Sequence, residues 1–272
     1  MTELELANMA LHLVGAEKID ALSDNTKRAI LMNDLMSPIR KEVLELGKWT
    51  FARKRVKLGG RTTAVTAEQV IPTSDEIDWG TSAHGYQTGD EVVFALVAGT
   101  VPAGLVDGTT YYVIRVDAYE IKLATTWTLA IAGVTYVDIT TAGSGTFTLT
   151  PTAPVFQYTY RYALPTDYLS FVREYYGYTF ETEGRYMLSD ESELNLIYIV
   201  DEEDESIFTP NFNKAYYLTL AAYAAYSLNN NTTQKESLLI EADRYISDAR
   251  CLDSQSTKPE DYEIDTFLDA RL

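Results

Sequence analysis

The hydrophobic period changes twice along this chain, and that change limits its fold more than any other feature. Residues 4–14 and 32–46 place apolar side chains three and four positions apart, which is the spacing of an amphipathic helix. Between residues 59 and 154 the pattern becomes short runs rich in Val, Thr, Tyr and Ile, separated by Gly, Pro and Asp. Helical spacing returns at residue 214. The sequence therefore predicts an α+β protein whose two ends contribute helices and whose middle contributes strands.

Two helices are predicted in the first fifty residues. A capping box at residues 2–5 starts the first helix, and Gly15 ends it. Ser23 or Asp24 is expected to cap the second helix. Pro38 lies inside the apolar stripe of that helix and removes a backbone donor, so we expect a kink or break there.

Strands are predicted between these helices and two more that close the chain. The closing helices are an alanine-rich stretch at residues 214–228, broken by residues 229–231, and a second helix that a capping box at Thr233 begins. In the middle block the predicted strands are residues 91–96, 111–116, 118–123, 135–139 and 146–150, and three more follow at 156–162, 184–189 and 194–200. Short strands at this spacing favour a small sandwich or barrel for the middle block.

Charge and composition exclude several classes of protein. The net charge is −18, with +2 on residues 1–59, −7 on residues 60–153 and −13 on residues 154–272. A chain this acidic has too few cations to bind nucleic acid tightly by displacing its counterions. An acidic wall would still let DNA slide past without sticking. No apolar run of about 18 residues predicts a membrane span, and no basic leader predicts a signal peptide. The single cysteine fits a protein made in a reducing cytosol.

Catalytic and metal-binding patterns are weak. His12 and His84 have no Cys or His at metal-ligand spacing, and Cys251 stands alone in a helical run. Residues 143–145 lack the Lys of a phosphate-binding loop, and the acidic run at residues 201–205 lacks EF-hand spacing. We therefore expect no enzyme, no metal and no cofactor, although a carboxylate pair for glycoside cleavage has no signature in sequence spacing.

The run GKWTFARKR at residues 47–55 combines aromatic and basic side chains. Trp49 and Phe51 alternate as they would on an entering strand, and both could belong to the core. The basic side chains that follow are Arg53, Lys54, Arg55 and Lys57. They fit either a solvated strand edge or a patch that pairs with an acidic neighbouring subunit. Trp49 and these four residues are our candidates for a subunit or portal interface.

Further pieces of the chain follow that run in a characteristic order. They are YRYALPTD at residues 160–167, GRYMLSD at residues 184–190, and Phe208-Thr209-Pro210 before the alanine-rich helix. Together with the first helix and GKWTFARKR, they resemble the tail tubular protein A family, the head-to-tail adaptor proteins of short-tailed bacteriophages. The resemblance covers residues 2–58 and 155–256.

The resemblance implies a structural virion protein at the head-to-tail junction, made in the host cytoplasm. Such proteins form a ring, of twelve copies in the family, beneath the portal protein. They hold a tail nozzle protein of the tail tubular protein B type, and double-stranded DNA passes through the middle. Tail fibres are a further expected partner, and no membrane contact is expected.

The block at residues 61–154 departs from the family and is expected to be an inserted all-β domain. Its ends, Arg61 and Pro154, should lie close together, because an insertion must leave the surrounding fold intact. We expect it to decorate the outer wall or to contact fibres. The alternative function is a receptor- or glycan-binding module, with Tyr111 and Trp127 on the insert surface, and a tail hydrolase ranks third.

These observations predict a discontinuous adaptor core of residues 1–60 and 155–272. Its helices come from both ends of the chain and pack with a small antiparallel sheet, while residues 61–154 loop out. Residues 259–272 alternate acidic and apolar side chains and are expected to dock on the portal. Their candidate contacts are Tyr262, Ile264, Phe267 and Leu268.

Overall fold

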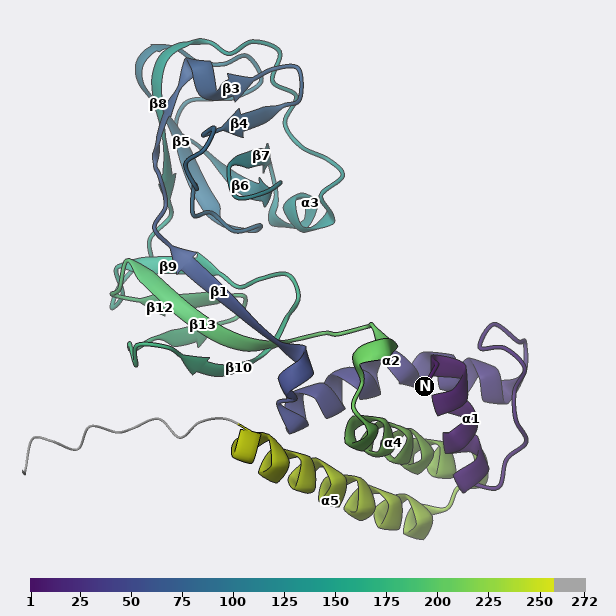
Figure 1. The fold of residues 1–272 in the computed structure, drawn as a ribbon. Helices are drawn as coiled ribbons and strands as arrows, with labels where there is room; N and C mark the ends of the chain where they lie inside the picture. Colours follow the sequence, from purple (N-terminus) through teal and green to yellow (C-terminus); the bar gives the residue numbers. More distant parts are fainter. Residues whose placement is uncertain (257–272) are drawn as a thin grey trace, which may run out of the picture. The chain divides into compact units, whose positions relative to one another are not determined.

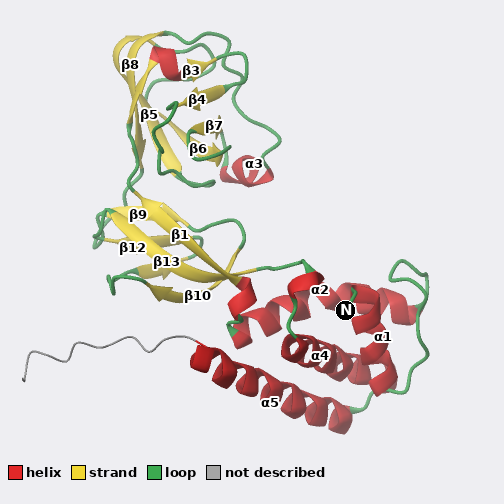
Figure 2. Cartoon of the chain, viewed as in Figure 1, coloured by secondary structure: helices red, strands yellow, loops and turns green. Residues whose placement is uncertain are grey.

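The computed structural model describes residues 1–256 and shows an α+β protein that divides into two compact units. One unit joins residues 1–53 to the chain from Ile199 onward, and the other contains Lys54–Tyr198. The first unit is built from long helices and the second mainly from strands (Figures 1 and 2). The two ends of the chain therefore do share one helical body.

Helix α1 (Glu3–Leu13) begins at the predicted capping box. The Thr2 hydroxyl accepts a hydrogen bond from the Glu5 N–H (3.2 Å), and the Glu5 carboxylate accepts one from the Thr2 N–H (2.9 Å). Gly15 follows with a φ of 72°, a conformation that glycine adopts without steric cost. Both predicted ends of this helix are confirmed.

Helix α2 (Lys27–Gly47) differs from its prediction at two points. Thr26 caps it, because the Asp24 carboxylate instead accepts hydrogen bonds from two N–H groups of the preceding loop. The helix also continues through Pro38, so the predicted break is wrong. Buried residues on both sides of the proline anchor the helix to the core, and this packing outweighs the lost backbone hydrogen bond.

Helices α4 (Pro210–Asn229) and α5 (Thr232–Ser256) complete the helical unit. Asn230 ends α4 in the left-handed conformation, with φ 53°, which confirms the predicted asparagine break. Asn231 then accepts a hydrogen bond from the N–H three residues later (3.0 Å) at the start of α5. The predicted cap at Thr233 is wrong, because Thr233 already lies inside the helix.

Helix α4 is the centre of this unit. Eleven of its twenty residues are buried, and it packs against α1, α2 and α5. The Tyr216 hydroxyl donates to the Met36 carbonyl (2.9 Å), and the Asn229 amide donates to the Val14 carbonyl (2.9 Å). These bonds join segments about 200 residues apart, so neither end of the chain completes its core without the other.

The acidic run at residues 201–205 has a structural role in the same unit. The buried Arg40 guanidinium donates to both carboxylate oxygens of Asp201 (3.0 and 3.2 Å) and to Glu203 (2.6 Å). Since a buried charge needs partners of opposite sign, this ion cluster fixes the loop that leads into α4.

Two small sheets form one part of the strand-rich unit. Their strand orders are β1-β13-β10 and β11-β12-β9. Their bounds are β1 Arg53–Gly59, β9 Tyr160–Ala163, β10 Tyr168–Glu174, β11 Glu181–Glu183, β12 Tyr186–Ser189 and β13 Glu193–Val200. Leu58, Leu194 and Leu196 from one sheet pack with Tyr162 and Met187 from the other, so the sheets share a core.

A larger antiparallel sheet of seven strands forms the rest of this unit, in the order β2-β8-β5-β6-β7-β4-β3. Its strands are β2 Ala64–Thr66, β3 Val70–Ile71, β4 Glu76–Asp78, β5 Glu91–Thr100, β6 Thr109–Arg115, β7 Glu120–Ala124 and β8 Ser144–Pro151. The short helix α3 (Trp127–Ala132) packs against β6 and β7. The edge strands β2 and β3 are separated by only one helical turn, η2 (Ala67–Gln69), so the sheet curls nearly into a barrel around one core.

The seven-stranded sheet is anchored to the small sheets by buried charges. Arg61 donates to both oxygens of Asp90 (3.0 and 2.6 Å) and to the Arg161 carbonyl (3.0 Å), while Asp90 also accepts from the Ala163 N–H (2.9 Å). Arg161 forms an ion pair with Glu91 (2.7 Å). The structure therefore groups residues 155–198 with the predicted insert, and the largest sheet belongs to the insert and not to the helical unit.

The ends of the predicted insert lie close to each other, as an insertion requires. The chain enters on β2 and leaves on β8, and these strands pair from Ala64↔Thr148 to Thr66↔Thr146. Just before them, the Leu149 N–H donates to the Thr63 carbonyl (2.8 Å).

One predicted strand is wrong, and another is confirmed only at its end. Residues 135–139 form a loop. Its Val137 N–H donates to the Leu123 carbonyl of β7 (2.7 Å), but its Ile139 N–H donates to the Asp75 carboxylate (2.6 Å), so no ladder continues. Of the strand predicted at residues 156–162, only Tyr160 onward is a strand, and Phe156 is 78% exposed. An alternating aromatic pattern was thus mistaken for a half-buried face.

Candidate interaction surface

The two histidines lie in different surroundings and in different units. His84 is 1% exposed, and its Nδ1 accepts a hydrogen bond from the Tyr86 N–H (3.0 Å) while its Nε2 lies 3.1 Å from the Asp117 carbonyl. Burial lowers the pKa of this imidazole, which suits a neutral ring with one donor and one acceptor. His12 is exposed on α1. Among residues 1–250, whose side chains are described, no three His, Cys, Asp or Glu side chains come together as metal ligands.

The aromatic half of GKWTFARKR lies in the helical core. Trp49 is 5% exposed, donates from Nε1 to the Val43 carbonyl (2.8 Å) and meets Phe212 edge to face at 5.3 Å. Phe51 packs against Phe208 and Phe212. A Cβ at Gly47 would collide with the indole, which explains why glycine precedes the tryptophan. Trp49, a candidate interface residue, is thus inaccessible in the folded unit.

The basic half lies on strand β1. Lys54 pairs with Asp167 and Lys57 with Glu193, each at 2.8 Å, and Arg53 donates to the Lys48 carbonyl (3.2 and 3.0 Å). Arg55 is exposed and has no ion pair in the described part of the chain. Among the candidate interface residues, Arg55 is therefore the one that we expect to form an ion pair with a partner's carboxylate.

The Lys54–Asp167 pair joins the two stretches of sequence on which the family resemblance most depends. The Asp167 carboxylate also accepts a hydrogen bond from the Tyr198 hydroxyl (3.0 Å). Burial, with the nearby Asp167 charge, raises the pKa of that tyrosine, so the hydroxyl remains a donor at neutral pH. About 110 residues separate GKWTFARKR from YRYALPTD in sequence, yet the fold brings them into contact.

Two pockets lie beside β1. The first, of about 390 Å³, is lined by Arg55 and Lys57 from β1, by β13 residues including Asn195, and by Tyr175 and Tyr176. The second, of about 350 Å³, is lined by Arg55 and Val56 together with Val116, Pro165 and Tyr198. Arg55 and Val56 line both pockets, whereas Lys57 and the two tyrosines line only the first.

Three tyrosines beside the first pocket were not predicted. Tyr175 and Tyr176 are 64% and 62% exposed, and Tyr178 is 38% exposed. The buried carboxylate of Glu174 holds their turn, because it accepts hydrogen bonds from the N–H groups of Tyr178 (2.9 Å) and Asn195 (3.2 Å). Exposed tyrosines on a fixed turn are typical of protein contacts, and their crowding at residues 175–178 was visible in the sequence.

The predicted surface residues of the insert are not available as a ligand platform. Tyr111 is 3% exposed, and its hydroxyl accepts a hydrogen bond from the Val106 N–H (3.0 Å). Trp127 is half-buried, and the Arg185 guanidinium lies 3.5 Å above its ring. Tyr111 therefore fails as a surface residue, and Trp127 already has a cation on its face.

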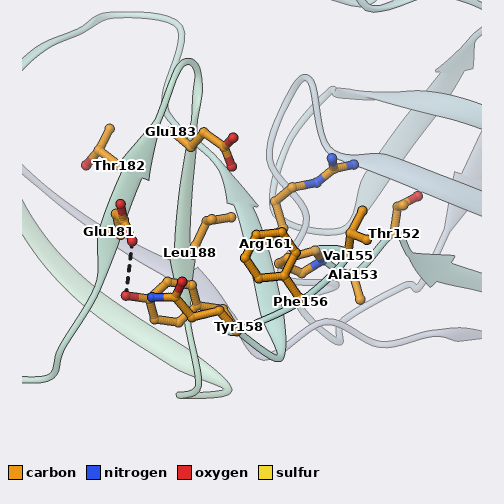
Figure 3. A pocket seen from close by; sticks show the side chains of 12 residues that line it. Thr152, Ala153, Val155, Phe156, Tyr158, Arg161, Glu181, Thr182, Glu183 and Leu188 are labelled. Atoms are coloured by element: carbon orange, nitrogen blue, oxygen red, sulfur yellow. Dashed lines mark hydrogen bonds between the residues drawn. The ribbon is translucent and has the colours of Figure 1, made fainter.

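Figure 3 shows a further pocket, of about 480 Å³, between residues 152–158 and 181–183. The Tyr158 hydroxyl donates to the Glu181 carboxylate (3.3 Å) across it. Val155 and Phe156 on its rim are 97% and 78% exposed. The pocket therefore combines exposed apolar side chains with the hydroxyl and carboxylate of Tyr158 and Glu181.

The remaining predicted contacts lie outside the described residues; these are Tyr262, Ile264, Phe267 and Leu268. Among the helices that are described, none is both long and apolar enough to cross a bilayer. Comparison of the sequence with known protein-family models and with curated proteins found no match.

Proposed function

We propose that this protein is a structural virion component that assembles with copies of itself into a ring at the head-to-tail junction of a short-tailed bacteriophage. The ring would join the portal protein to the tail nozzle protein and let double-stranded DNA pass. The proposal rests mainly on the Lys54–Asp167 ion pair, which brings together the two stretches that resemble head-to-tail adaptors. The helical unit built from both ends of the chain also supports it.

The distribution of charge suits assembly around a hole. Arg55 is an exposed cation on β1, whereas residues 154–272 carry a net charge of −13. Surfaces of opposite sign on one chain favour head-to-tail contacts, and such contacts close into rings. An acidic wall would also repel the phosphates of passing DNA. We infer a mechanical rather than a catalytic role.

In this proposal the insert is a contact domain on the ring's outer wall. The glycan-binding alternative loses its candidate residues, because Tyr111 is buried and Arg185 covers Trp127.

The test is electron microscopy and native mass measurement of the purified protein, alone and mixed with the portal protein of the same phage. We expect rings on the portal with the symmetry of an adaptor. A protein that stays monomeric and unbound in the mixture would refute the proposal.

A further inference from the structure

We propose that the free edge of β1 accepts residues 261–265 of a second copy of this chain as an added strand. This inference rests on the proposed function, because it names the contact by which neighbouring copies in the ring would hold each other.

The edge itself is the first argument. In the order β1-β13-β10, β1 is the outermost strand, and no further strand pairs with it within residues 1–256. An outermost strand presents a row of N–H and C=O groups that an extended segment can pair with.

The two faces of β1 are the second argument, because they differ in chemistry. Arg55 and Lys57 are exposed and lie two positions apart, so they share one face of β1. Val56 lies between them in sequence and packs against the shared core, so it belongs to the other face. Side chains of a strand alternate between faces, so a matching partner must be acidic on one side and apolar on the other.

Residues 261–265 have that alternation. Asp261, Glu263 and Asp265 carry the acids, and Tyr262 and Ile264 lie between them in sequence. Paired with β1, the three acids would face Arg55 and Lys57, and the two apolar side chains would face Val56. Because Lys57 already pairs with Glu193, Arg55 would supply most of the unsatisfied charge.

The cations on β1 also prevent the wrong strand from pairing with this edge, which supports the choice of an acidic partner. Lys and Arg on an edge strand repel another copy of the same edge and so prevent unwanted sheet extension. An acidic strand is the one kind that they attract. The same side chains would therefore exclude β1–β1 pairing and select the acidic segment.

The experiment measures binding of a fluorescent peptide of residues 258–272. The acceptor is the full chain carrying Tyr262→Asp and Ile264→Asp, so that its own segment does not compete. We expect saturable binding that weakens about tenfold or more when Arg55→Glu is added. The matched control, Arg244→Glu on an exposed part of α5, should change affinity less than about twofold.

Peptide chemistry tests the mode of binding. Along a paired strand, only every second N–H points to the neighbour. A peptide N-methylated at Tyr262 and Ile264 and one N-methylated at Asp261, Glu263 and Asp265 should therefore differ at least tenfold in affinity. Equal affinities would overturn strand addition, as would Arg55→Glu without effect in a chain whose circular dichroism is unchanged.

The outcomes separate this inference from the proposed function. Rings on the portal without peptide binding to the chain would overturn the inference and leave the function standing. The same holds if the portal protein, and not the chain, binds the peptide. Peptide binding without any ring on the portal would refute the function but support the contact.

Discussion

At the scale of single residues, buried ions determine which parts of this acidic chain stay together. Arg61 and Asp90 are 6% and 2% exposed in their side chains, and Asp90 accepts four hydrogen bonds at once. The Arg61 guanidinium also lies 4.7 Å from the Tyr162 ring centre. When an ion pair is buried and fully hydrogen-bonded, removing one partner lowers stability far more than it does in an exposed ion pair.

We predict that Asp90→Ala destabilises the strand-rich unit by about 3–5 kcal/mol, because it leaves a buried guanidinium without a counter-charge. Glu193→Ala, which removes the exposed partner of Lys57, should cost at most about 1 kcal/mol. Urea unfolding followed by circular dichroism measures both. Similar losses in the two variants would contradict this account.

His84 should make the unit less stable in acid. Burial lowers its pKa in the folded state, so below about pH 6.5 the unfolded chain binds a proton that the folded chain does not. The free energy of unfolding is then unaffected above that pH and falls as pH drops through it, by up to about 1.4 kcal/mol per pH unit.

The measurement is urea unfolding from pH 7.5 to pH 5 in wild type and in His84→Gln, whose amide can keep one donor and one acceptor. The variant should show the shallower decline. His12→Gln, at an exposed position, should decline as wild type does. A His84 variant with the wild-type slope would argue against a buried neutral imidazole.

At the scale of elements, packing overrides local preference. Helix α2 tolerates Pro38 because Met36 and Ile39 beside it are 4% and 3% exposed and hold the helix to the core. The Tyr216 hydroxyl also bonds the Met36 carbonyl there. Pro38 still lowers the stability of α2, because it lacks a backbone N–H, and the packing of the rest of the helix compensates for this loss.

Pro38→Ala should therefore stabilise the helical unit by about 1–2 kcal/mol. The alanine restores one backbone hydrogen-bond donor, and this gain exceeds the loss of the proline's restriction of the unfolded chain. Ser37→Ala, at the neighbouring exposed position, should change stability by less than about 0.5 kcal/mol. Thermal unfolding checks both variants. A destabilised Pro38→Ala would mean that the helix requires the proline's geometry.

At the scale of the whole molecule, the chain crosses between its two units on β1 and β13, which are neighbouring strands. The strand-rich unit has its own two apolar cores, one between the small sheets and one inside the seven-stranded sheet. Its ends therefore lie close together, and its stability comes from contacts within it.

We predict that residues 54–198 fold when expressed alone, with circular dichroism of a β protein and dispersed amide resonances. Residues 61–154 alone should unfold at a lower temperature, because Asp90 and Glu91 lose Ala163 and Arg161 as partners. A higher unfolding temperature for residues 61–154 than for residues 54–198 would show that these contacts between the sheets do not stabilise the unit.

Much of the fold was predictable because it depends on short-range chemistry. The first helix with its capping box and the asparagine break at residue 230 follow from hydrogen-bonding groups a few positions apart. The strand at residues 193–200 follows from its run of apolar and β-branched side chains. The caps predicted at Asp24 and Thr233 are wrong because Thr26 and Asn231 accept the capping hydrogen bonds instead. At residues 135–139, the Ile139 N–H bonds to the Asp75 carboxylate, 64 positions away in sequence.

The sequence by itself determined the order of helix and strand, the aromatic and basic halves of residues 47–57, and the acidic balance of the chain. Only the tertiary structure decided that Trp49 and Tyr111 are buried, that Arg55 is exposed, and that residues 155–198 pack with the insert. The reason is physical. Period and capping act over a few residues, whereas burial and ion pairing depend on groups such as Lys54 and Asp167 that only the folded chain brings together.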